Sequence, residues 1–150
     1  MAHEYRTTRR VEFADTDMAG IAHFANFFRW MEQAEHEFVR SLGHRVHGGE
    51  GFVGFVRAHA SCDYRRPARY EDVLDVVVRV ARKTSKGLHY EFEFRESGTS
   101  DSPGASNGPS GELLASGRLE VVCVDRDPET QRLRAIDIPP DLAACFDVAP

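Results

Sequence analysis

The chain has 150 residues, of which 41% are hydrophobic and 29% charged, and its formal net charge is -5. This length and composition indicate one globular domain over residues 1–150. The negative charge argues against a nucleic-acid partner, because phosphate contacts need a basic face. No apolar run is long enough to span a bilayer, and the polar N-terminus does not resemble a signal peptide, so we expect a cytoplasmic protein without a membrane partner.

The cysteines and histidines show no pattern typical of a disulfide framework or a metal site. Cys62, Cys123 and Cys145 are far apart and odd in number, which favours small buried side chains in a reducing compartment. His44 and His47 lie close together, but no third ligand follows at a recognisable spacing. We therefore expect no metal and no bound cofactor.

The first third of the chain predicts a strand, a turn and a long helix. Residues 4–13 are predicted to form a polar edge strand, and residues 15–20 form a turn. A helix should begin near His23 or Phe24 and end before Gly43. Its apolar side chains recur at three- and four-residue steps, the period of one helical face: Phe24, Phe27, Phe28, Met31, Ala34, Phe38 and Leu42.

The rest of the chain alternates apolar and polar residues, as strands do. We expect extended segments, separated by turn residues and prolines, over residues 52–66, 73–80, 88–95 and 113–125. A basic hairpin turn should occupy residues 81–87, and a short helix is expected after Pro140. Residues 97–111 are rich in glycine, serine and proline, which predicts a flexible insertion that folding does not need.

These elements predict an α+β fold. An antiparallel sheet of about five strands must have its apolar face covered, and the one long helix is the only sizeable candidate. We therefore expect the sheet to wrap around that helix. Such a sheet has two edges that can pair with another copy, so we also expect a homodimer or a tetramer built from two dimers.

The residues with the strongest chemical signal lie between Val11 and Trp30. Asp15 and Asp17 enter a turn that contains Gly20, and the predicted helix begins directly afterwards. The first amides of a helix have no internal partner and can stabilise an oxyanion, while a nearby carboxylate can attack a carbonyl or deprotonate water. This combination is the minimum for acyl transfer, although Asp15 and Thr16 would also serve simply to cap a turn.

The motif Asp15-x-Asp17-x-x-Gly20, followed by the aromatic helix segment NFFRW, resembles the 4-hydroxybenzoyl-CoA thioesterase family of hot-dog enzymes. The segment CDYRRPARYEDVL and the later Ile138-Pro139 resemble further elements of that family. The resemblance implies a hot-dog fold, paired subunits and hydrolysis of acyl-CoA thioesters. It implies that Asp17 is the catalytic carboxylate and that the oxyanion amide lies near His23 and Phe24.

Other residues have supporting roles in this interpretation. Gly20 allows the tight turn, Asn26 either bonds the carboxylate or substrate or is simply a polar helix residue, and Asp15 is expected to bond turn amides. The resemblance favours Arg82 and Lys83 as ligands of the CoA phosphates, with a second basic cluster at Arg65, Arg66 and Arg69. Glu32 and Glu35 are also candidates, because other hot-dog thioesterases use a helix glutamate, but they lie beyond the first turn of the predicted helix and so rank below Asp17.

Two other functions stay open from the sequence. A hot-dog protein can bind an acyl-CoA or acyl carrier without turning it over, and a hot-dog dehydratase would need a histidine paired with a carboxylate, for which His23 is the candidate. The acyl group is also open. Phe24, Phe27 and Phe28 are compatible with an aromatic acyl chain, but the same residues are explained as helix core.

Overall fold

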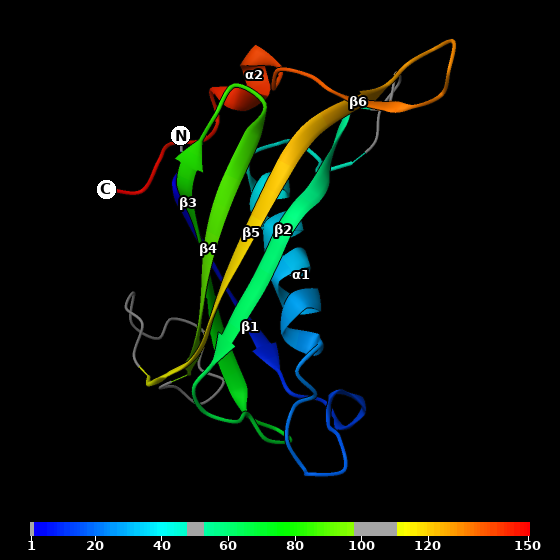
Figure 1. The fold of residues 1–150 in the computed structure, drawn as a ribbon. Helices are drawn as coiled ribbons and strands as arrows, with labels where there is room; N and C mark the ends of the chain where they lie inside the picture. The colour runs from blue at the N-terminus through cyan, green and yellow to red at the C-terminus, as the bar shows by residue number, and fades with distance from the viewer. Residues whose placement is uncertain (1, 48–52, 98–110) are drawn as a thin grey trace.

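The computed structural model of the chain describes residues 2–47, 53–97 and 111–150. It has a curved sheet with one long helix against one of its faces (Figure 1). In chain order the elements are β1 (Glu4–Arg10), a 3-10 turn (Phe13–Asp15), α1 (Asn26–Ser41), β2 (Gly54–Tyr64), β3 (Val73–Lys83), β4 (Gly87–Glu96), β5 (Leu113–Arg126), β6 (Leu133–Ala135) and α2 (Pro140–Ala143).

The strands lie in the order β1-β3-β4-β5-β2, and every neighbouring pair is antiparallel. β2 therefore pairs with β5 and lies at one edge, although β3 follows it in the sequence. The four consecutive strands expected from the sequence are present, but the link over residues 65–72 is a crossover to the other side of the sheet. The link packs against the segment that precedes α1, where the Ala22 amide donates to the Ala68 carbonyl at 2.7 Å.

One face of α1 is buried against the sheet, as the apolar period predicts. Trp30, Met31, Ala34 and Phe38 are at most 3% exposed. The ring of Phe27 packs edge-on against Phe94 of β4, with 5.0 Å between the centroids. Gly117 of β5 allows the helix to approach closely, since an added Cβ there would lie 2.3 Å from the Met31 Sδ. The expected α+β arrangement of one sheet around one helix is thus confirmed.

The boundaries around the Asp17 turn differ from the prediction. β1 ends at Arg10 rather than at residue 13, because residues 13–15 form the 3-10 turn. α1 begins at Asn26, so His23 and Phe24 precede the helix instead of opening it. The segment forms a turn instead: the Asn26 amide donates to the His23 carbonyl at 3.0 Å, and the His23 amide donates to the Asp15 carbonyl at 2.7 Å.

The hairpin between β3 and β4 is shorter than predicted. After a bulge, Arg82 and Lys83 still pair with His89 and Leu88. The connecting turn is therefore residues 84–86, and the expectation that both basic residues lie in the turn is wrong. The bulge lets the two strands continue beyond the point where the alternation of side chains breaks.

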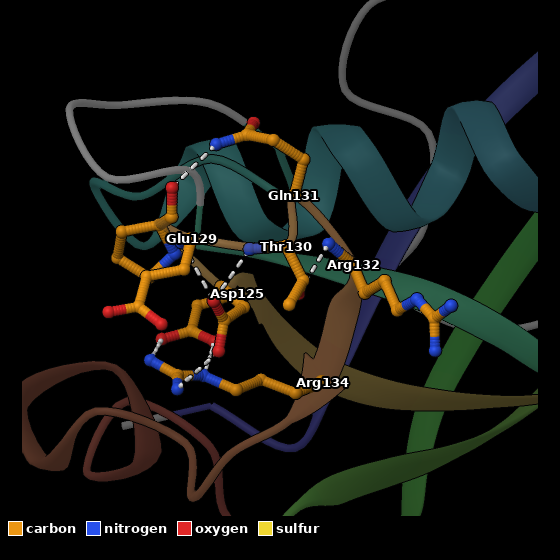
Figure 2. Close-up of polar contacts among 8 residues, drawn as sticks. Asp125, Glu129, Thr130, Gln131, Arg132 and Arg134 are labelled. Atoms are coloured by element: carbon orange, nitrogen blue, oxygen red, sulfur yellow. Dashed lines mark hydrogen bonds and ion pairs between the residues drawn. The ribbon is translucent and has the colours of Figure 1, made fainter.

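The prediction that β5 ends before Asp127 is confirmed, but the short strand β6 that follows was not predicted. Asp127 Oδ1 accepts hydrogen bonds from the amides of Glu129 (2.8 Å) and Thr130 (3.0 Å), which turns the chain. Arg134 of β6 then forms a two-point contact with Asp125 of β5, at 2.6 and 3.2 Å (Figure 2). Because these contacts join side chains from both arms of the hairpin, the composition of either arm alone does not reveal them.

The predicted flexible insertion falls mainly on residues 98–110, which lie outside the described residues. No helix within the described ranges is both long enough and apolar enough to cross a membrane.

Candidate active site

The turn that carries Asp17 is closed by its own backbone. The Asp17 amide donates to the Ile21 carbonyl at 2.9 Å, and the Gly20 amide donates to the Asp17 carbonyl at 3.0 Å. Gly20 has φ +78°, a conformation that a residue with a Cβ rarely adopts, so the expected need for glycine is confirmed. The Asp17 Oδ1 accepts a hydrogen bond from the Ala19 amide at 2.8 Å, which orients the half-buried carboxylate.

The base of the turn is formed by Asp15, whose side chain is buried. Its Oδ2 accepts a hydrogen bond from the Glu12 amide at 2.9 Å, so the expected bond to a turn amide is present. Its Oδ1 accepts a charged hydrogen bond from Arg29 Nη2 at 2.6 Å. The buried carboxylate is therefore satisfied on both oxygens, as a buried charge must be.

The two amides expected to stabilise an oxyanion are in different situations. The His23 amide is already bonded to Asp15, whereas the Phe24 amide has no hydrogen-bond acceptor within the described residues. The His23 ring nitrogen Nδ1 accepts from the Ala25 amide at 3.2 Å, so the ring stabilises the local turn. This contact does not create the histidine–carboxylate pair that a dehydratase would need.

Asn26 is drawn into the same network. Its Nδ2 donates to the Asp15 carbonyl at 2.7 Å, and its Oδ1 accepts from Arg29 Nη2 at 2.8 Å. In the structure, Asn26 therefore has a role that the sequence did not suggest: it ties the start of α1 to the base of the Asp17 turn.

A cavity of about 450 Å³ opens beside Asp17. Its lining is mostly apolar and aromatic and comes from three segments, with two arginines: Ile21, Ala22, Phe24, Phe27, Tyr64, Arg65, Arg66, Pro67 and Ala68. Tyr64, at the end of β2, donates its hydroxyl to the Phe24 carbonyl at 2.8 Å, and its ring packs edge-on against Phe27 with 5.2 Å between centroids. The sequence prediction missed Tyr64, because only the pairing of β2 with β5 brings it to this site.

The predicted phosphate ligands lie elsewhere. Arg82 and Lys83 are at the end of β3 near α2, whereas the Asp17 turn lies at the opposite end of the sheet (Figure 1). The Lys83 ammonium donates to the carbonyls of Ala143 (3.0 Å) and Phe146 (2.9 Å), so it holds the C-terminal segment in place. Among the described residues that line the Asp17 cavity, the basic ones are Arg65 and Arg66.

The two helix glutamates differ in accessibility. Glu32 is exposed, whereas Glu35 is only 1% exposed and is bound by Arg57 of β2 through two hydrogen bonds of 2.6 and 3.0 Å. Burial raises the pKa of Glu35 from the usual 4.5 to about 7, and the Arg57 guanidinium opposes this rise. Glu35 lies outside the lining of the Asp17 cavity. Its contact with Arg57 instead joins α1 to the edge strand β2 within the core.

No group of three or more His, Cys, Asp and Glu side chains able to hold a metal ion occurs in the described parts of the chain.

A family model described as the Thioesterase-like superfamily matches residues 11–146, which is most of the chain. The protein belongs to this superfamily. The resemblance noted from the Asp15-to-Gly20 motif is therefore confirmed at the level of the family.

Two curated relatives and one solved structure place the chain more closely. It is 28% identical over 145 residues to the 4-hydroxybenzoyl-CoA thioesterase of Pseudomonas sp. strain CBS-3, covering 94% of this chain and 96% of that protein. It is 32% identical over 98 residues to a 1,4-dihydroxy-2-naphthoyl-CoA hydrolase of Prochlorococcus marinus strain MIT 9313, covering 58% of this chain and 64% of that protein.

The solved structure is a crystal structure of a mutant 4-hydroxybenzoyl-CoA thioesterase in complex with 4-hydroxybenzoyl-CoA. It superposes with a TM-score of 0.79 over 97% of this chain and 100% of that chain, at 21% identity. This likeness establishes the hot-dog fold. Three curated relatives that are 32–41% identical to the chain are matched over only 54–64% of their own length.

The buried Glu35 predicts a pH dependence of stability. The folded protein holds a proton at Glu35 that the unfolded chain releases near pH 4.5, so this group makes the fold less stable as pH rises from about 4.5 to about 7. Glu35→Gln removes the effect. We expect the stability of the variant, relative to the native protein, to increase across that window by up to about 3 kcal/mol, measured by urea unfolding at several pH values.

The matched control is Glu96→Gln, which removes an exposed carboxylate from β4. Its stability difference from the native protein should not follow the same curve. If the stability of Glu35→Gln relative to the native protein decreased as pH rose, pairing with Arg57 would outweigh the cost of burial.

Proposed function

We propose that the protein is an acyl-CoA thioesterase that uses Asp17 as its catalytic carboxylate and the Phe24 amide as its oxyanion donor. The observation that carries the proposal is that Asp17 and Phe24 border one apolar cavity, and that the Phe24 amide has no acceptor among the described residues. An amide held ready by the surrounding fold stabilises the developing oxyanion without reorganisation.

Two routes of hydrolysis fit a single carboxylate. In one, an Asp17 oxygen attacks the thioester carbonyl, the C–S bond breaks to release CoA as the thiol after protonation, and water then hydrolyses the acyl-aspartyl anhydride. In the other, Asp17 takes a proton from water, and that water attacks the carbonyl directly. Both routes give a free acid and CoA, and neither needs a cofactor beyond the CoA that the substrate carries.

The acyl group that best fits the cavity is aromatic. Phe24, Phe27 and Tyr64 supply ring surfaces, and a volume of about 450 Å³ falls within the usual range for small-molecule sites. The two curated relatives described above are named for hydroxylated benzoyl and naphthoyl thioesters. Both lines of support favour a one-ring or two-ring aryl group over a long aliphatic chain.

We propose a homodimer, or a tetramer of two dimers, as the active form. β2 has a strand neighbour on one side only among the described elements, and such an edge favours pairing with another strand. If two copies pair β2 with β2 around a two-fold axis, the strands run antiparallel, so the Arg82 end of one sheet comes close to the Asp17 end of the other. Arg82 could then contact the CoA phosphates from the partner subunit.

A panel of acyl-CoA substrates tests the activity. We expect benzoyl-type and naphthoyl-type thioesters to release CoA thiol with higher kcat/KM than acetyl-CoA or palmitoyl-CoA, because a ring can pack against the three aromatic side chains. The readout is thiol release with a chromogenic disulfide. Tight binding of an aryl-CoA without thiol release would instead identify a non-catalytic binding protein.

Asp17→Asn should reduce kcat by on the order of 10²-fold or more, since an amide can act neither as a base nor as a nucleophile. The melting temperature should stay close to that of the native protein. Asp63→Asn, on β2 and exposed, serves as the control and should leave kcat unchanged. Near-normal turnover of the Asp17 variant would transfer the catalytic role to Glu32, because Glu35 is buried and paired.

A subunit-mixing experiment tests whether two chains share a site. Subunits with Asp17→Asn and subunits with Arg82→Glu are refolded together, and turnover is measured at low substrate concentration. Sharing predicts about one intact site per mixed dimer, since a two-fold dimer has two equivalent sites. Lys83 stays unchanged because it anchors the C-terminal segment.

Activity no higher than the average of the two parents, in material shown to be mixed, would contradict sharing through Arg82. A monomer by light scattering at micromolar concentration would contradict the assembly itself.

A further inference from the structure

Three polar side chains connect the base of the Asp17 turn to the first turn of α1. Arg29 Nη2 donates to the Asp15 Oδ1 at 2.6 Å and to the Asn26 Oδ1 at 2.8 Å. Asn26 Nδ2 in turn donates to the Asp15 carbonyl at 2.7 Å. We call Asp15, Asn26 and Arg29 the helix–turn clamp. It is a closed ring of contacts, and each member is bonded to both others.

The clamp acts on both groups that the proposed mechanism uses. Asp15 is two residues before Asp17, and the backbone hydrogen bonds of the turn begin at Thr16, the next residue. The orientation of Asp15 therefore sets the direction of the chain as it enters the Asp17 turn. The Asp15 carbonyl also accepts the His23 amide at 2.7 Å. This bond fixes the chain immediately before the Phe24 amide, which is the expected oxyanion donor.

The charge of Arg29 is needed because the carboxylate of Asp15 is buried. Asp15 is 7% exposed, and its only other side-chain partner within the described residues is the Glu12 amide. A buried carboxylate without a charged donor is strongly disfavoured, so it would turn toward water if Arg29 were lost. Loss of Arg29 would also release the Asn26 Oδ1, and Asn26 holds the same Asp15 carbonyl that accepts the His23 amide.

We infer that Arg29 is a positioning residue for thioester hydrolysis: through Asp15 and Asn26, it holds the Asp17 carboxylate and the Phe24 amide in register with each other. This inference rests on the proposed function. Arg29 itself does not line the cavity, so its effect is indirect. A displacement of about 1 Å between reacting groups can reduce turnover by on the order of 10²-fold.

A positioning role for Arg29 has a different kinetic signature from a purely structural role. Loss of a residue that only stabilises the fold lowers the fraction of folded protein but leaves kcat per folded site unchanged. Loss of a residue that aligns two reacting groups lowers kcat, while KM changes little, because substrate binding depends on the cavity wall.

The test is Arg29→Ala, with Arg40→Ala as the matched control. Both arginines are exposed on α1, but Arg40 lies in its last turn, away from the clamp. With an aryl-CoA substrate, we expect Arg29→Ala to lower kcat by about 10- to 100-fold with KM within about threefold of the native value. Arg40→Ala should change neither. Added guanidinium, at millimolar concentrations below those that unfold the protein, should restore part of the lost kcat.

Arg29→Lys covers the case in which the alanine variant does not fold. An ammonium group can reach Asp15 or Asn26 but does not reproduce the planar fork, so kcat should fall between the native and alanine values. Unchanged kcat for folded Arg29→Ala, or an equal loss for Arg40→Ala, overturns the inference. If the native protein hydrolyses no acyl-CoA in the panel, the proposed function has failed instead, and the two failures are thereby distinguished.

Discussion

The burial of one face of α1 against the sheet is the contact on which the rest of the structure depends. Large side chains such as Trp30 and Phe38 are almost completely removed from water, and each contributes roughly 1.5–3 kcal/mol through buried apolar area. Because α1 is the one long helix among the described residues, every strand except β6 must be arranged around it. The ends of the sheet are then the places where the connecting segments meet.

The active-site candidate lies at one of these ends because of this arrangement. The segment that enters α1 and the crossover that leaves β2 contact each other there, through the Ala22 and Ala68 backbone and through the Tyr64 hydroxyl on Phe24. The cavity beside Asp17 is formed where they meet. The buried core therefore supports a short turn that its own hydrogen bonds close, which is a common way to place a functional group accurately.

Two buried carboxylates, Glu35 and Asp15, lie in different surroundings. Glu35 is deep in the core, where burial raises its pKa to about 7 even though Arg57 contacts both oxygens. Asp15 lies nearer the surface and receives one charged and one backbone donor. Both pairs join α1 to another element, Glu35 to the edge strand and Asp15 to the Asp17 turn.

Local patterns in the sequence were enough to predict several elements. The three- and four-residue period of apolar side chains located α1, the alternation in residues 88–95 located β4, and the spacing of Asp15, Asp17 and Gly20 identified the turn. Tertiary contacts set four further features: the pairing of β2 with β5, the hydrogen bond of the His23 amide, the place of Tyr64 in the cavity lining, and the position of Arg82 at the far end of the sheet. The physical reason is that periodicity reports which face of an element is buried, whereas these features are contacts between residues far apart in the chain, and their partners are set by how the whole sheet closes around the helix.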